Sequence, residues 1–163
     1  MLTGSLPIPL AMTIGARSGQ NSQTALHTKE RIMSTEADIR TLITGWMDAI
    51  VGTDLDKVVA NHSDDIVMFD VPPPHNGVRG MTAYRDSWPP FFDFIRSGAV
   101  FELHELSVEA GEDVGFAYGL LRCGGEKEFA ENPDNRLRLT LGLRRVDGNW
   151  VVVHEHHSFP ATN

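Results

Sequence analysis

The chain has 163 residues, of which 41% are hydrophobic and 22% are charged, and this composition is typical of one globular domain with a substantial core. Its 22 acidic and 14 basic residues give a net charge of −8, which argues against nucleic-acid binding because such binding needs Lys and Arg to neutralise phosphates. The single cysteine, Cys123, excludes an intrachain disulfide and a zinc site built from thiolates, and it favours a reducing, cytoplasmic setting. No apolar run approaches the roughly 20 residues of a membrane-spanning helix, so we expect no membrane insertion.

The first 33 residues differ in composition from the rest. A short apolar patch with two prolines precedes a stretch rich in Gly, Ser, Gln, Asn and Thr, and it lacks the basic start of a signal peptide. We interpret residues 1–33 as a disordered leader and residues 34–163 as the domain. Two alternatives stay open: Met33 is the true start and the upstream stretch is a translated extension, or this stretch is a weak signal peptide.

Two helices are predicted directly after the leader. Ser34 or Thr35 can cap the first helix, which Gly52 ends. Asp54 can cap a shorter second helix that ends at the polar cluster 63–65. The apolar residues of the first helix recur at the spacing of one buried face, at Ile39, Leu42, Ile43, Trp46, Met47 and Ile50.

A strand and a third helix follow. The run 66–71 is compact and apolar, and three prolines at 72–74 and a turn at Gly77 close it, as expected for a strand. From about Gly80 the apolar residues return to helical spacing, at Met81, Tyr84, Trp88, Phe91, Phe92 and Ile95.

The remainder of the chain has the period-two pattern of strands. Three or four long antiparallel strands are predicted from Val100 onward, with a bulge before Val108 and a polar loop over 124–134. Asp147 and Gly148 predict a hairpin turn between the last two strands. Helices gathered on an antiparallel sheet make the fold class α+β.

Two stretches, GTDLDKVVANHSDDIVMFDVPPPHNGVRGMTAYR and RLRLTLGLRRVDGNWVVVHEHHSFP, resemble the ketosteroid-isomerase-like or SnoaL-like branch of the NTF2-like superfamily. The resemblance covers about residues 36–158. It implies an NTF2-like cone, in which a curved mixed or antiparallel sheet packs on three N-terminal helices around an apolar pocket. It also implies a homodimer formed through the outer face of the sheet. The reaction is not implied, because this fold occurs in isomerases, cyclases, dehydratases, hydrolases and binding modules.

In the resembling isomerases a general-base aspartate ends the first strand before a proline-rich turn, and Asp70 in MFDVPPP matches that position. Trp46 stands where the family has a tyrosine, and the place of its second aspartate falls on or near Leu141. Without these two donors an enolate would lose roughly 3–4 kcal/mol of stabilisation. The resemblance therefore argues against a true steroid isomerase.

The turn of the last hairpin decides which residues face the pocket. We favour a three-residue turn with a bulge at Gly148 over a two-residue turn, which would shift the pairing by one residue and separate the apolar sets. The pocket face then carries Leu137, Leu139, Leu141, Leu143, Val151, Val153, Glu155 and His157. The opposite face carries Arg138, Thr140, Arg144, Trp150, Val152, His154 and His156, and we expect the dimer contact there.

The candidate catalytic residues are Asp70, His157 and Glu155, a polar cluster in an otherwise apolar cavity. Burial should raise the pKa of Asp70 unless an Arg or His pairs with it. The other pocket residues are expected to be Trp46, Phe69, Tyr84, Trp88, Phe92, Leu141 and Val153. Alternatively, the polar residues only cap the proline turn and satisfy buried groups, and the aromatic stripe at helical spacing, Tyr84, Trp88, Phe91 and Phe92, belongs to the core.

The run from His154 to His157 invites a metal interpretation, because imidazoles two residues apart on a strand point the same way. We predict no metal, since His75 and His104 are the only candidates for a further ligand and nothing in their spacing requires it. We expect His154 and His156 to form hydrogen bonds with Arg138 and Thr140 across the sheet or the dimer interface, and their placement in the pocket instead stays open.

Two functions remain. The first is a small-molecule enzyme that uses Asp70 as the base for isomerase-like, cyclase-like or dehydratase-like chemistry on an apolar carbonyl compound. The alternative is a non-catalytic, dimeric ligand-binding or structural module. Neither function calls for a cofactor, and the expected partners are a small apolar molecule and a second copy of the chain.

Overall fold

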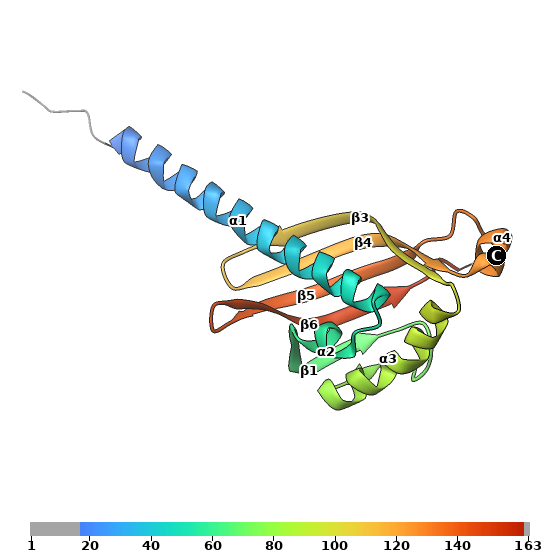
Figure 1. The fold of residues 1–163 in the computed structure, drawn as a ribbon. Helices are drawn as coiled ribbons and strands as arrows, with labels where there is room; N and C mark the ends of the chain where they lie inside the picture. Colours follow the sequence, from blue (N-terminus) through green and yellow to red (C-terminus); the bar gives the residue numbers. More distant parts are fainter. Residues whose placement is uncertain (1–16, 162–163) are drawn as a thin grey trace, which may run out of the picture. The chain divides into compact units, whose positions relative to one another are not determined.

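The computed structural model describes residues 17–161, which divide into a unit ending at Arg31 and a unit beginning at Ile32. In the first unit the described residues, 17–31, are helical, and the described side chains, 23–31, are exposed. The second unit holds the helices and the sheet that follow (Figure 1). Within the described residues, no helix is both long enough and apolar enough to cross a bilayer.

The first helix, α1, spans Arg17–Val51, so the predicted start at Ser34 or Thr35 is wrong, whereas its end before Gly52 is confirmed. The polar residues that suggested a leader are compatible with a helix, because Thr28 Oγ1 donates a hydrogen bond to the Thr24 carbonyl at 2.9 Å within the helix itself. Residues 17–33 are therefore helical, and residues 1–16 lie outside the described residues. The division into a leader and a domain stays a prediction.

Two further helices are present as predicted, although the second ends at Val59, before the polar cluster 63–65 that was expected to end it. In α2, Leu55–Val59, the Asp54 side chain caps the first turn by accepting a hydrogen bond from the Lys57 amide. The third helix, α3, spans Met81–Arg96. A short helix that was not predicted, α4 at Glu126–Glu131, lies in the expected polar loop, and the Glu128 side chain accepts a hydrogen bond from the Gly125 amide at 2.9 Å.

The strands form one six-stranded mixed sheet in the order β2-β1-β6-β5-β4-β3 (Figure 1). Strands β1 and β6 are parallel, and all other neighbours in this sheet are antiparallel, so the predicted α+β class with a mixed sheet is confirmed. The strands are β1 (His62–Phe69), β2 (Val78–Arg79), β3 (Val100–Ala110), β4 (Val114–Gly124), β5 (Leu137–Val146) and β6 (Asn149–Ser158).

Strand β1 begins at His62, earlier than the predicted start at residue 66. The side chains of His62 and Ser63 are buried, and the register of β1 against β6 is irregular between His62 and Val67. At this irregularity the polar side chains of Asp64 and Asp65 are both exposed. The sequence around them therefore lacks the alternation of a strand, and for this reason the start of β1 was placed too late.

The last hairpin turns through two residues, Asp147 and Gly148, and Val146 pairs directly with Asn149. Both turn residues have positive φ, 48° and 83°, as this tight turn requires. The predicted three-residue turn is therefore wrong, because the Asp-Gly pair can adopt the left-handed conformation at both positions.

A β-bulge at Val153 corrects the alignment of β6 farther along the strand, where the register against β5 shifts between Gly142 and Leu143. Before the bulge, Trp150 and Val152 therefore point into the core and not to the opposite face as predicted. Beyond the bulge, the predicted inward position of the last residues is recovered. The buried residues of β6 are Trp150, Val152, Glu155 and His157.

The inner face of the sheet, defined as the face that carries Leu139, Leu141 and Leu143, packs against the helices of the second unit. From α1, Trp46 contacts the ring of Phe101 on β3 with a centroid distance of 6.4 Å. The opposite or outer face carries Arg138, Thr140 and Arg144, which are exposed. Any apolar site enclosed by the helices must therefore lie on the inner side.

Candidate functional site

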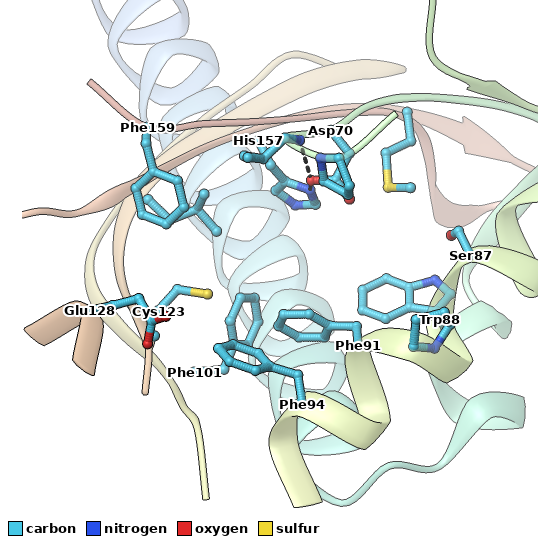
Figure 2. Close-up of a pocket in the computed structure, with 16 residues that line it drawn as sticks. Asp70, Ser87, Trp88, Phe91, Phe94, Phe101, Cys123, Glu128, His157 and Phe159 are labelled. Atoms are coloured by element: carbon cyan, nitrogen blue, oxygen red, sulfur yellow. Dashed lines mark hydrogen bonds and ion pairs between the residues drawn. The ribbon is translucent and has the colours of Figure 1, made fainter. Parts of the chain in front are cut away.

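A cavity of about 420 Å³ lies between α3 and the inner side of the sheet. Its walls are mainly aromatic, with rings from Trp88, Phe91, Phe94, Phe101 and Phe159. Figure 2 shows Asp70 and His157 on one side of this space and the α3 and β3 rings across from them. The cavity thus has one polar edge and an otherwise apolar interior.

Asp70 stands directly after β1, where the three prolines end the strand. Its Oδ1 accepts a hydrogen bond from the Val71 amide at 2.7 Å and lies 3.4 Å from Nδ1 of His157. The Asp70 side chain is 31% exposed, whereas that of His157 is 6% exposed. Both side chains line the cavity, and Asp70 is the more exposed member of the pair.

His157 lies between two carboxylates. Its Nδ1 faces Asp70, and its Nε2 lies 3.8 Å from Oε2 of Glu155. The indole of Trp46 is nearly parallel to the imidazole, with an interplanar angle of 9° and a centroid distance of 6.4 Å. The structure thus places the three predicted catalytic residues in a row, Asp70, His157 and Glu155, but Glu155 does not line the cavity.

Glu155 is fully buried and is held by two residues that the sequence analysis did not assign to the catalytic cluster. The Tyr84 hydroxyl donates a hydrogen bond to Glu155 Oε1 at 2.6 Å, and His62 Nε2 lies 2.6 Å from the same oxygen. His62 Nε2 also lies 3.0 Å from the Tyr84 hydroxyl. Tyr84 was predicted to line the pocket, but it is part of this buried cluster instead.

The pKa values in the row are shifted in opposite directions. Burial opposes the charge of Asp70, but the neighbouring His157 and the hydrogen bond from the Val71 amide outweigh burial and lower the Asp70 pKa. Burial also opposes the charge of His157, yet Asp70 and Glu155 together raise the His157 pKa. Glu155 is buried as well, and its hydrogen bond from His62 and the nearby charges lower its pKa. The sequence analysis predicted that burial raises the Asp70 pKa unless an Arg or His pairs with it. His157 is such a partner, and the pKa is lowered.

Of the predicted pocket residues, Trp88 lines the cavity and the others do not. The assignment of Phe69 and Val153 to the pocket is wrong, because neither side chain lies on the inner face. Phe69 contacts the rings of His154 and His156, and Val153 lies at the bulge. The alternation of β1 instead directs Met68 into the cavity. The alternative interpretation placed Tyr84 and Phe92 in the core, and both are buried there. The remaining predicted residues, Trp46 and Leu141, also belong to the core.

Several cavity residues were not predicted. Phe94 and Phe101 complete the aromatic wall, Cys123 contributes a thiol, and Glu128 comes from the unpredicted helix α4. The helical aromatic stripe that was assigned to core or pocket contains Phe91, so a signal for this wall was present. No local pattern marks these two residues, because Cys123 reaches the cavity through the pairing of β3 with β4 and Glu128 through the position of α4 after β4.

The histidines that suggested a metal lie on the outer face. His154 donates a hydrogen bond from Nδ1 to the Val67 carbonyl at 2.8 Å, a different partner from the predicted Arg138 or Thr140. His156 is exposed and pairs in register with Thr140. In the described part of the chain, no three His, Cys, Asp or Glu side chains are arranged to hold a metal ion.

A family model described as SnoaL-like domain matches residues 39–162. None of the curated proteins matches the chain. Among solved structures, an NTF2-like protein of unknown function from Pseudomonas putida is 35% identical to this chain, covers 80% of it and 89% of its own length, and superposes with a TM-score of 0.71.

Two more distant structures share the fold. An NTF2-like protein with a cystatin-like fold from Novosphingobium aromaticivorans is 16% identical, covers 91% of this chain and 94% of its own, and has a TM-score of 0.66. A protein described as a candidate ketosteroid isomerase from Shewanella frigidimarina is also 16% identical, covers 72% and 92%, and has a TM-score of 0.58. At these identities the likeness concerns the fold alone.

Proposed function

Because the chain belongs to the SnoaL-like family, we propose that it binds a small apolar carbonyl compound in the cavity and moves a proton on it without a cofactor, with Asp70 as the base. The observation that carries this proposal is the pairing of a carboxylate with an imidazole at the edge of an aromatic cavity. Such a pair presents an acceptor and a donor to the same ligand.

The spacing of the pair leaves both groups available. The 3.4 Å between Asp70 Oδ1 and His157 Nδ1 exceeds the usual 2.7–3.2 Å of an N–H···O hydrogen bond, so this contact leaves the N–H available to a ligand oxygen. Oδ2 of Asp70 accepts no hydrogen bond from the described residues. The lowered pKa of Asp70 and the raised pKa of His157 favour the charged form of each near neutral pH.

The two groups can act together on a ketone. Asp70 takes a proton from the carbon beside the carbonyl, the C–H electrons form the new C=C bond, and the carbonyl π electrons move to oxygen. The His157 N–H donates to this oxygen and stabilises the developing charge, a contribution of roughly 3–4 kcal/mol for one well-placed donor. His157 would thereby replace the donors that are missing at Trp46 and Leu141. In a β,γ-unsaturated ketone the enolate is extended to a dienolate, and return of the proton to its γ carbon moves the C=C bond and completes an isomerisation.

Solvent-deuterium exchange tests the proposal. With β-tetralone as the probe, a compact aromatic ketone with acidic C–H bonds, NMR should detect deuterium incorporation catalysed by the wild-type protein. Asp70→Asn should slow this exchange at least about 100-fold, because a general base contributes about that factor or more. Asp64→Asn, the same change at an exposed position of β1, is the matched control and should leave the rate unchanged. Equal exchange by wild type and Asp70→Asn would remove Asp70 from the mechanism.

The second candidate is a binding module without catalysis. The lowered pKa of Asp70 favours it, because a carboxylate that is easily ionised is a weak base. In that case β-tetralone binds, as seen in chemical-shift changes of Trp88 and Phe101, but no deuterium is incorporated by either protein. Binding with exchange supports the enzyme, and binding without exchange supports the module.

A further inference from the structure

A buried polar cluster lies behind His157, away from the cavity. Its members are Glu155, Tyr84 and His62, whose side chains are at most 1% exposed, and none of them lines the cavity. The proton transfer described above uses none of these three residues. Their burial is costly unless every polar group has a partner, so the arrangement calls for a physical reason.

We propose that Glu155, fixed by hydrogen bonds from Tyr84 and His62, is a positioning residue that orients the His157 ring and keeps it charged at the edge of the cavity. Tyr84 and His62 are positioning residues as well, because they hold Glu155, which in turn acts on His157. The catalytic meaning of this arrangement rests on the proposed function, whereas its effect on His157 can be measured without any substrate.

The two oxygens of Glu155 have different surroundings. Oε1 receives the Tyr84 hydroxyl and His62 Nε2, each at 2.6 Å, so its acceptor capacity is used. Oε2 has no hydrogen-bond partner among the described residues and lies 3.8 Å from His157 Nε2. The contacts on Oε1 thus fix the carboxylate with its free oxygen turned toward the imidazole.

The three cluster residues also restrain one another. The Tyr84 hydroxyl gives its hydrogen to Glu155, and its oxygen lies 3.0 Å from His62 Nε2, so it can share the single N–H that His62 directs to Glu155. The rings of His62 and Tyr84 lie 4.8 Å apart at an interplanar angle of 26°. Because the members come from β1, α3 and β6, the carboxylate is held from two sides and cannot rotate freely.

Few other charges act on His157. On its Nδ1 side stands Asp70, and on its Nε2 side stands Glu155. The neighbours on α1 and β5, Trp46 and Leu139, carry no charge. The Cys123 thiol near Asp70 stays neutral, because burial and the charges of Asp70 and Glu128 raise its pKa to about 12. Removal of the Glu155 charge should therefore have a clear effect on His157.

The first experiment follows the protonation of His157 by NMR in protein labelled with ¹⁵N and ¹³C histidine. Glu155→Gln removes the charge with little change of shape, and the titration midpoint of His157 should fall by about one to three pH units. Glu109→Gln, a glutamate change at an exposed position of β3, should leave the midpoint unchanged. An unchanged midpoint in a folded Glu155→Gln protein would overturn the inference.

The second experiment tests the residues that hold Glu155, and it remains informative if Glu155→Gln does not fold. Tyr84→Phe deletes one donor to Oε1, so the ¹³C signal of the Glu155 carboxyl should titrate at a pH higher by about one unit. The other tyrosine, Tyr118, is exposed, and Tyr118→Phe is the matched control. His62→Gln should shift the Glu155 titration in the same direction, whereas His104→Gln on the exposed bulge of β3 should not. No shift in either cluster variant would contradict a positioning role.

The exchange of β-tetralone separates this inference from the proposed function. If the positioning role and the proposed function are both correct, the alkaline limb of the pH-rate profile for exchange shifts to lower pH in Glu155→Gln, together with the His157 titration midpoint. A lowered midpoint in a protein that never exchanges β-tetralone supports the positioning role and rejects the catalytic proposal. An alkaline limb and a midpoint that both stay in place reject the positioning role and leave Asp70 as the base.

Discussion

The pair of Asp70 and His157 makes the stability of the fold depend on pH in two directions. The Asp70 pKa is lowered in the folded chain, so its stabilisation is present above the unfolded pKa and is lost as the pH falls through the folded value. The His157 pKa is raised, so its stabilisation is present below the unfolded pKa and is lost as the pH rises through the folded value. The contribution of the pair is therefore largest between the unfolded pKa of Asp and that of His.

Urea unfolding of wild type and Asp70→Asn at several pH values tests this dependence. Asp70→Asn should lower the free energy of unfolding by about 1 kcal/mol near pH 6, where the wild-type pair is charged. The difference should shrink at low pH, where protonation of Asp70 removes the pair from the wild type as well. A difference that is constant from pH 3 to pH 8 would show that the charge of Asp70 adds nothing to stability.

At the scale of the elements, the bulge in β3 makes Gly119 on β4 irreplaceable by a larger residue. The register of β3 against β4 shifts between Leu103 and Glu105, and a Cβ on Gly119 would overlap the Glu105 carbonyl oxygen. The clash is with backbone, which cannot rotate away as a side chain can. The glycine is therefore required by a close approach of two strands.

Gly119→Ala should accordingly destabilise the chain by about 2 kcal/mol, as for a tightly packed site that must shift. Gly45→Ala is the matched control, because Gly45 is on the exposed side of α1 and a Cβ there meets nothing within 4 Å. This helical change should instead stabilise by up to about 1 kcal/mol. The midpoint of urea unfolding measures both, and equal effects of the two substitutions would rule out the backbone clash.

The elements that the sequence predicts best are those with an unbroken period, such as α3 and β5. In β6, the sequence analysis placed Val151 and Val153, and not Val152, on the inner face. Three consecutive valines do not show by their pattern which of them points inward. The two-residue turn makes Val152 the inward residue, and the bulge at Val153, which depends on the pairing with β5, returns Glu155 and His157 to the inner face. A local pattern cannot contain that information.

The candidate site was predictable to the same extent. Asp70 is marked by the three prolines, and Glu155 and His157 by their alternation on a strand whose turn is recognisable. By contrast, Tyr84 lies 71 residues and His62 lies 93 residues from Glu155 along the chain. Contacts between residues so far apart arise from the tertiary fold, and no spacing in the sequence indicates them.

For the molecule as a whole, we propose that two copies associate through the outer face of the sheet. Phe116 and Tyr118 on β4 are 48% and 49% exposed, and their rings stack at an interplanar angle of 19°. His156 lies on the same face, as predicted, whereas Trp150 and Val152 do not take part because they are in the core. An exposed pair of large aromatic rings on a broad sheet favours an interface between symmetric copies.

Analytical ultracentrifugation should therefore report the mass of a dimer at micromolar concentration. Phe116→Lys places a charge at the proposed contact and should produce monomers. Val51→Lys, at an equally exposed apolar position at the end of α1, should leave the dimer intact. A wild-type monomer, or a dimer that only the α1 substitution disrupts, would contradict the proposed interface.

Deletion of residues 1–33 should change the melting temperature by less than about 2 °C. The described side chains from residue 23 to residue 31 are exposed, so their removal costs little buried apolar surface, and the buried Thr35 is retained. Circular dichroism of the full chain and of the shortened chain provides the comparison. A large drop in melting temperature would show that this segment belongs to the folded domain.

The position of Cys123 gives the chain an internal reporter. It is the only thiol in the sequence, it lines the cavity, and its pKa of about 12 keeps it almost entirely protonated at neutral pH. Alkylation must therefore be slow, and no second thiol contributes to the signal. A molecule that fills the cavity covers this sulfur, so the rate of labelling by iodoacetamide measures occupancy directly and ranks candidate ligands before any reaction is known.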